Sequence, residues 1–208
     1  MSSLESKIKI ISGAREMFLE RGFYKFTIDD LASLLKMSKK TIYKYFSSKS
    51  EILEFVVKSV TGEIRKGVEK IVESDRNPVE KLYDWSRLLA TISHRVNLEG
   101  IYEMQLQYPK VWEMADEIRS KIIKRNFAKI IEDGKKEEVI KNYNTELMLS
   151  VLVGAIREVV NPKYIIENNL TIQNTIDEVV GIIIDGMLTE KGKQIFNNYK
   201  IGSGHETV

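Results

Sequence analysis

Cysteine is absent from these 208 residues, and histidine occurs only as His94 and His205. Without cysteine, neither a disulfide framework nor a thiolate metal site can form, so we expect a protein of the reducing cytoplasm. No apolar run approaches the roughly 20 residues that cross a bilayer, and the opening MSSLESKIKII lacks the apolar core of a secretory signal. The sequence therefore predicts a folded protein that does not enter a membrane.

The residue patterns of enzymatic sites are missing as well. Neither histidine belongs to a Glu-x-x-His or His-x-x-x-His pair, and no glycine-rich phosphate loop occurs. These absences argue against an enzyme, such as a helical bundle with di-metal or acid–base chemistry. We predict no catalytic residue, no metal site and no cofactor.

Apolar residues recur every three or four positions through most of the chain, which is the period of an amphipathic helix. Thr27, Ser38 and Ser48 each precede a helical stretch and are the predicted caps, while Pro78 begins one helix and Pro109 ends another. No alternating run or hairpin signal predicts a strand. We expect an all-α fold, with two strongly apolar helices at about 145–160 and 172–188.

Three further expectations concern helix boundaries and faces. The first helix should begin with a capping box at Ser2 and end at Gly22, and a helix at 110–133 should close near Gly134. Residues 135–144 should form a polar connection. The first helix should bury the stripe Leu4, Ile8, Ile11, Ala14 and Phe18.

Positive charge is concentrated near the N-terminus. Residues 1–58 hold 11 Lys or Arg and 7 Asp or Glu, whereas residues 59–208 hold 21 and 23. The segment 36–53, KMSKKTIYKYFSSKSEIL, has five lysines and no acid before Glu51. Such asymmetry fits an anionic partner, although chance variation in surface charge gives the same totals.

The helices beginning after Thr27 and Ser38 have the layout of a helix-turn-helix, whose second helix lies in the DNA major groove. With Ile42 and Phe46 turned to the core, Lys40, Thr41 and Lys44 fall on the opposite arc and Tyr43 on its flank. Lysine on such a face releases counterions from DNA, and hydroxyl groups supply positioning hydrogen bonds. Double-stranded DNA is therefore the expected partner.

From about Ile8 to Leu53, this sequence resembles the tetracycline-repressor (TetR) family of transcription regulators. The most specific part is MSKKTIYKYFSSKSEIL, which is similar to the family's recognition helix, its Tyr-x-x-Phe pair and the lysine that opens helix four; GAREMFLERGFYKFTIDDLA supports it. The resemblance covers about a quarter of the chain. It implies an N-terminal three-helix DNA-binding domain followed by a larger helical domain for ligand binding and dimerisation. It implies that Lys39, Lys40, Thr41, Tyr43, Lys44 and Tyr45 face DNA and that Thr27 and Lys49 hold phosphates. To these predicted DNA contacts we add Lys36 and Ser38.

Two lysines in this motif need a physical reason. Lys36 stands where the helix-turn-helix turn usually has glycine, so a left-handed backbone there would cost about 1 kcal/mol. Lys49 stands at a helix start, which disfavours a cation by a few tenths of a kcal/mol unless a phosphate binds there. A solvated lysine that costs little is the alternative for Lys49.

The larger domain offers two hypotheses. Aromatic residues between Pro78 and Gly134 belong either to the core or to the wall of an apolar ligand pocket, for which we name Trp85, Leu89, Tyr102, Gln105, Tyr108 and Trp112. The last two apolar helices carry small residues that let helices approach closely, across a dimer or within one chain. For a homodimer we name Val151, Leu152, Ile156, Val159, Ile176, Val180, Ile183 and Met187.

Together these patterns predict a homodimeric repressor that binds a palindromic operator and is released by a small, largely apolar ligand. The expected domains are a DNA-binding domain at 1–48, a regulatory and dimerisation domain at 49–200, and a flexible tail at 201–208. The alternative function is a DNA-binding structural or cell-division factor of the same fold without an inducer. A tightly filled C-terminal core would favour that alternative.

Overall fold

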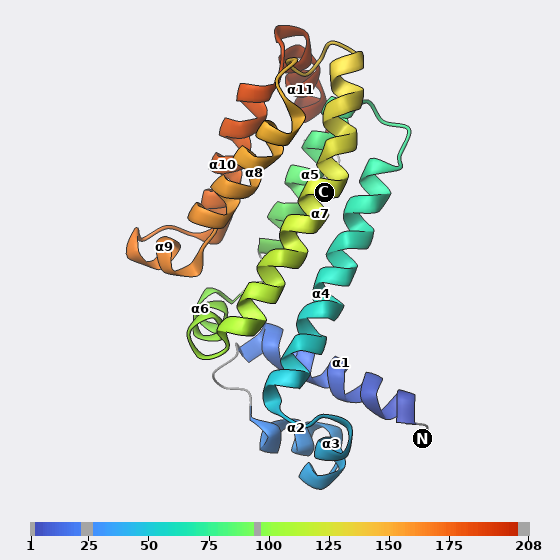
Figure 1. Ribbon diagram of the computed structural model, residues 1–208, viewed down its shortest axis with the longest axis vertical. Helices are drawn as coiled ribbons and strands as arrows, with labels where there is room; N and C mark the ends of the chain where they lie inside the picture. Colours follow the sequence, from blue (N-terminus) through green and yellow to red (C-terminus); the bar gives the residue numbers. More distant parts are fainter. Residues whose placement is uncertain (1–2, 22–26, 94–96, 204–208) are drawn as a thin grey trace. The chain divides into compact units, whose positions relative to one another are not determined.

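The computed structural model describes residues 3–21, 27–93 and 97–203, and within them the protein is helical (Figure 1). The only β feature in these ranges is an isolated bridge between Ile140 and Leu188. The all-α prediction is therefore confirmed. The helices are α1 (Ser3–Arg21), α2 (Ile28–Leu35), α3 (Lys39–Tyr45), α4 (Lys49–Val72), α5 (Pro78–Ser93), α6 (Leu98–Gln107), α7 (Pro109–Lys136), α8 (Thr145–Val159), α9 (Pro162–Glu167), α10 (Ile172–Met187) and α11 (Glu190–Ser203).

The chain forms two compact units. The first comprises residues 1–63 and 95–118, and the second comprises residues 64–94 and 119–208. The division falls inside α4 and α7, so each of these helices contributes to both units. The predicted caps Ser2 and Gly22, both histidines and most of the predicted tail lie outside the described residues.

An apolar cluster joins α1, α2 and α3 to the first turns of α4. Leu31, Ile42 and Phe46 are at most 1% exposed at its centre. Gly13 lets α1 approach α2, since a Cβ there would lie 2.7 Å from Leu35 Cδ2. The Lys9 ammonium also donates to the carbonyl of Leu35 at 3.2 Å. The helix-turn-helix is thus held from behind by α1.

The predicted buried face of α1 is partly wrong. Leu4 and Ile8 are 69% and 55% exposed, whereas Ile10 and Met17 are buried beside Ala14. The predicted stripe and the stripe of Ile10, Ala14 and Met17 are adjacent on the helix, and apolar periodicity alone does not decide which of them is buried. The cluster begins at Ile10, so packing against α2 and α3 selects the second stripe for burial.

A second cluster in the first unit joins α4 to α6 and the start of α7. Leu53 and Val57 of α4 pack with Met104 and Val111, all less than 10% exposed. Tyr108 and Trp112 are partly buried against the same residues. The apolar residues at the start of α4 therefore meet α6 and α7 within about two turns of Lys49.

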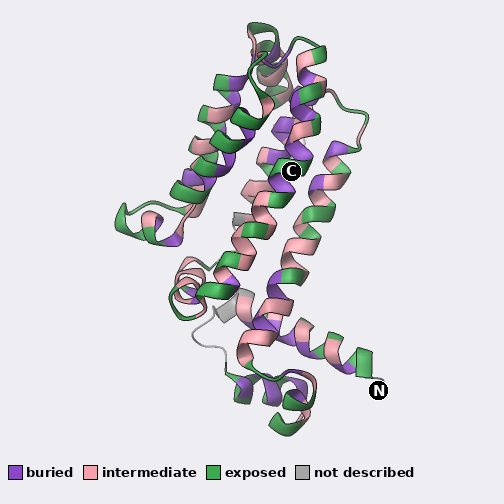
Figure 2. Ribbon diagram, in the orientation of Figure 1, coloured by how far each residue is buried: buried purple, intermediate pink, exposed green. Residues whose placement is uncertain are grey.

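In the second unit, α5 packs against α10 and α11, and α10 also packs against α8. Trp85 is 2% exposed and meets the ring of Phe127 edge-on, with centroids 4.3 Å apart. Figure 2 shows buried residues along one side of α8 and α10 and exposed residues along the other. These helices are amphipathic even though their sequences are apolar almost throughout.

The connection after α7 is not simply polar. Its residues Val139 and Ile140 are 2% exposed, and the peptide of Lys141 donates to the carbonyl of Met187 at 2.9 Å. Gly134 does not end α7, which continues to Lys136. A Cβ on Gly134 would lie 2.5 Å from Ile140 Cδ1, so this glycine is needed for the chain to fold back on the helix.

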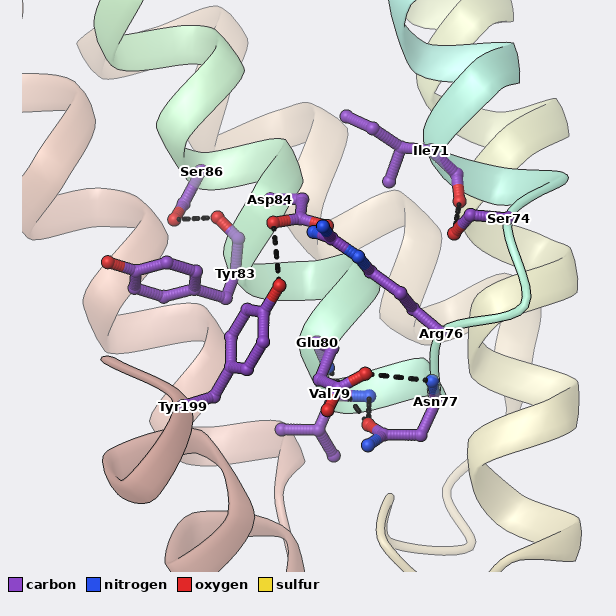
Figure 3. Close-up of polar contacts among 10 residues, drawn as sticks. All are labelled: Ile71, Ser74, Arg76, Asn77, Val79, Glu80, Tyr83, Asp84, Ser86 and Tyr199. Atoms are coloured by element: carbon purple, nitrogen blue, oxygen red, sulfur yellow. Dashed lines mark hydrogen bonds and ion pairs between the residues drawn. The ribbon is translucent and has the colours of Figure 1, made fainter. Parts of the chain in front are cut away.

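Helix α11, which the sequence analysis did not predict, is fixed to α5 by a polar and aromatic cluster (Figure 3). The Arg76 guanidinium pairs with Asp84 and lies 5.7 Å from the ring centroid of Tyr199. Tyr199 donates weakly to Asp84 at 3.5 Å and meets the ring of Tyr83 edge-on at 5.4 Å. Partial burial raises the pKa of the Tyr199 phenol. The cluster thereby joins the α4–α5 connection and α5 to the C-terminal helix.

Candidate nucleic-acid interface

Side chains cap α3 as the sequence predicts. Ser38 is the N-cap, its Oγ accepting from the Thr41 N–H at 3.0 Å and lying 2.8 Å from the Thr41 hydroxyl. Ile42 is buried, and Phe46 ends the helix with 1% exposure. Two anchored apolar residues and one cap thus fix which face of this short helix is outward.

The outward face of α3 carries positive charge. Lys39, Lys40 and Lys44 are exposed, as is Tyr43, and α3 itself contains no acid. Thr41 is half-buried. Tyr45 is also half-buried and packs against the apolar cluster, so its ring supports the helix rather than projecting freely from it.

Lys36 adopts the left-handed conformation, with φ 52° and ψ 45°. The peptide N–H of Met37 donates to the carbonyl of Ala32 at 2.9 Å, and that of Lys36 to the carbonyl of Ser33 at 3.2 Å. These bonds satisfy the end of α2 and account for the strained residue. The structure therefore matches the turn predicted at Lys36, whose side chain is exposed.

Two acids in the first turn of α2 interact with side chains that are predicted to contact DNA. Thr27 is the N-cap of α2: its hydroxyl accepts from the Asp30 N–H at 3.0 Å and donates to the Asp30 carboxylate at 2.6 Å. The Lys39 ammonium forms an ion pair with Asp29. The ion pair of Lys39 with Asp29 is exposed, so it is worth little. The sequence analysis anticipated Thr27 as a cap but not the ion pair of Lys39 with Asp29.

Lys49 is the first residue of α4, as predicted. Burial lowers the pKa of its half-buried ammonium group, and the charge of Glu103 opposes that shift. Ser48 caps the helix by accepting from the Glu51 N–H at 3.1 Å. The Glu51 carboxylate accepts from the N–H and hydroxyl of Ser47 at 2.6 and 2.8 Å, one residue earlier than a standard capping box.

A capped helix-turn-helix with a cationic outward helix is the pattern that a family model recognises in residues 10–56, described as "Bacterial regulatory proteins, tetR family". The HTH-type transcriptional regulator YdeS of Bacillus subtilis (strain 168) is 30% identical over 151 residues, covering 71% of this chain and 74% of that protein. The chain belongs to the TetR family of transcriptional regulators.

Solved structures agree in fold with this TetR-family chain. A TetR regulator from Haloarcula marismortui superposes with a TM-score of 0.73 at 17% identity, over 89% of this chain and all of that one. SmeT, solved as a complex with triclosan, superposes with a TM-score of 0.65 at 12% identity, over 89% and 93%. At these identities the likeness concerns the fold. TetR-family membership makes this chain a DNA-binding regulator rather than an enzyme.

The residues predicted to line a ligand pocket are divided between the two units. Tyr102, Gln105, Tyr108 and Trp112 belong to the first unit, where all four are half-buried on α6 and the start of α7. Leu89 and Trp85 belong to the second, where Trp85 is a core residue against Phe127. Of the six predicted pocket residues, the first four therefore lie in one unit, and Tyr108 and Trp112 pack against the same apolar cluster there.

The residues predicted for a dimer interface are mostly core residues of a single chain. Leu152, Ile156, Ile176, Val180 and Met187 are each less than 10% exposed. Val159 and Ile183 are half-buried, and Val151 is 56% exposed. The outward apolar residues of α8 and α10 are Leu147, Val151 and Ile182, of which only Val151 was named from the sequence.

Among the described residues, no group of three or more His, Cys, Asp or Glu could hold a metal ion. No described helix is long and apolar enough to cross a membrane.

Proposed function

We propose that this TetR-family chain is a homodimeric repressor that binds a palindromic operator and is released by a small, largely apolar ligand. The observation that carries the proposal is the outward face of α3, which presents exposed lysines at 39, 40 and 44 on a helix without acids. A transcription regulator needs such a face to meet a duplex, and phosphate neutralisation supplies most of its affinity.

In this proposal, α3 enters the major groove with Lys40, Thr41, Tyr43 and Lys44 toward the DNA, where the two lysines neutralise phosphates. Lys36, Ser38, Lys39 and Tyr45 flank that contact, while Thr27 and Lys49 hold phosphates at the starts of α2 and α4. Residues 1–48 act as the DNA-binding domain, 49–200 as the regulatory and dimerisation domain, and 201–208 as a tail.

The proposed dimer is formed by the outward faces of α8 and α10. Leu147 and Ile182 are 62% and 72% exposed, and Gly154, Gly181 and Gly186 have no neighbouring atom within 4 Å of a built Cβ. Pairing these faces about a two-fold axis gives a four-helix contact that buries the exposed apolar groups. The glycines allow the partner's helices to approach closely.

The proposed ligand contacts α6 and the beginning of α7. Tyr108 and Trp112 are partly buried against Leu53 and Val57 of α4, so an occupant beside them would push on the helix that begins at Lys49. The complex of SmeT with triclosan supports this part of the proposal, since a protein of the same fold binds a small organic compound. A ligand regulates only if it favours the state that does not bind DNA.

The experiment that tests the proposal is selection of bound sequences from random duplex DNA. A repressor dimer should recover an inverted repeat whose half-sites lie one helical turn, about 34–36 Å, or a multiple of it apart. A single unrepeated site would contradict the dimer, and recovery of no sequence motif would favour the alternative, a structural DNA-binding factor without an inducer.

A further inference from the structure

Lys49 and Glu103 lie on two helices that pack against each other within the first unit. Leu53 follows Lys49 by one turn on the same face of α4, and it shares an apolar cluster with Met104 of α6. Glu103 directly precedes Met104, and both charged side chains are half-buried. The packing of Leu53 on Met104 therefore brings the start of α4 beside the middle of α6.

The two charges interact across this contact. Burial lowers the pKa of the Lys49 ammonium, and the carboxylate of Glu103 acts in the opposite direction by stabilising the charged form. The other acid near the start of α4, Glu51, is bonded to the N–H and hydroxyl of Ser47. Glu103 thus favours the charged form of Lys49 from a neighbouring helix.

We propose that Glu103 is a positioning residue for DNA binding, because its carboxylate competes with a DNA phosphate for the ammonium group of Lys49. This inference rests on the proposed function, in which Lys49 is a phosphate contact. Without DNA, Glu103 compensates the half-buried ammonium. When DNA binds, the ammonium exchanges this carboxylate for a phosphate, and the lost attraction reduces the net affinity.

Because Glu103 lies on α6, a movement of α6 changes the electrostatic environment of Lys49 at the proposed DNA contact. Tyr102 and Gln105, two of the proposed ligand contacts, lie on α6 within two residues of Glu103. A ligand that moves this part of α6 toward Lys49 strengthens the competition and weakens DNA binding, whereas one that moves Glu103 away has the opposite effect. Regulation then requires only a small displacement of one carboxylate.

The test is a double-mutant cycle read by the anisotropy of a labelled mixed-sequence duplex, because phosphate contacts bind all sequences. Glu103→Gln should tighten binding by about two- to fivefold, the range of one partly solvated charge pair. The matched control Glu99→Gln removes the same charge from an exposed position of α6 and should change affinity less than Glu103→Gln. In a Lys49→Ala background, Glu103→Gln should have no effect beyond that of Glu99→Gln.

The inference is overturned if Glu103→Gln tightens binding no more than Glu99→Gln, or if the tightening persists when Lys49 is absent. Glu103→Asp, which keeps the charge, should retain affinity close to that of the unmodified chain; tightening equal to that of Glu103→Gln would also overturn it. If the unmodified chain itself fails to bind the duplex at low salt, the proposed function fails. Binding of the unmodified chain without any effect at Glu103 contradicts the inference alone.

Discussion

Helices α3 and α10 each leave one face uncovered, and the two faces differ in their chemistry. On α3 the exposed residues are mainly lysines and a tyrosine, above a core made by Ile42 and Phe46. On α10 the exposed residues include Ile182 and two glycines together with the acids Asp177, Glu178 and Asp185, above a core made by Val180 and Ile184. In the proposed function, the lysines of α3 meet an anion, whereas Ile182 and the glycines of α10 meet an apolar surface of the second copy.

The largest expected effect comes from placing a charge on the apolar face. Ile182→Lys should raise the dimer dissociation constant on the order of 100-fold, because the proposed contact would have to desolvate two added ammonium groups. Sedimentation equilibrium measures it. Leu106→Lys, at a 62% exposed position of α6, is the matched control and should leave the dimer intact. Equal dimerisation of both variants would remove α10 from the interface.

Removing charge from α3 should have the next largest effect. Replacing both Lys40 and Lys44 with alanine should lower the slope of log affinity against log salt by about 2, since each phosphate contact contributes about 0.9. The same change should leave the dimer constant unaltered. An unchanged salt slope would show that these exposed lysines do not meet phosphates.

Replacing glycine with alanine distinguishes a helix face in solvent from a helix face in the dimer, and the expected change in stability is smaller than the effects above. Gly62→Ala, in α4 with open space around its Cβ, should stabilise the fold by about 0.5–1 kcal/mol in a thermal melt. Gly181→Ala has equal space within one chain and should give the same gain in the monomer. If the partner's helix packs on Gly181, the added methyl should instead weaken dimerisation. A gain in stability without a loss of dimer would place Gly181 in solvent.

The smallest predicted effect is at the left-handed turn. Lys36→Gly should stabilise the first unit by up to about 1 kcal/mol, because glycine adopts a φ of 52° without strain. The same variant should bind DNA slightly more weakly, having lost one exposed cation near the backbone. Chemical denaturation measures the gain in stability. A loss of stability in Lys36→Gly would show that the backbone at Lys36 is not strained.

Local chemistry explains why the helix-turn-helix could be predicted closely. Thr27 and Ser38 cap helices through side chains that bond to the peptide three residues on, which depends only on neighbouring residues. The left-handed turn at Lys36 and the start of α4 at Lys49 are local in the same sense. The resemblance to the TetR family adds to these patterns and is confirmed by the comparisons.

Tertiary packing explains what could not be predicted. Helices α8 and α10 carry apolar residues on both faces, so periodicity did not reveal that Leu152 and Val180 face the core while Val151 and Ile182 face outward. The role of Gly134 depends on Ile140, which returns to it after a turn. The ion pair of Lys39 with Asp29 and the proximity of Glu103 to Lys49 join separate helices and leave no sequence signal.

The comparison between the two faces is tested most directly by one salt titration with two readouts on the same protein. DNA affinity should fall nearly linearly with log salt, because α3 binds through released counterions. Dimerisation should stay constant or strengthen slightly, because burial of apolar surface is not screened by salt. DNA affinity that is flat between low and moderate salt, or a dimer that dissociates in parallel with the DNA complex, would contradict the account.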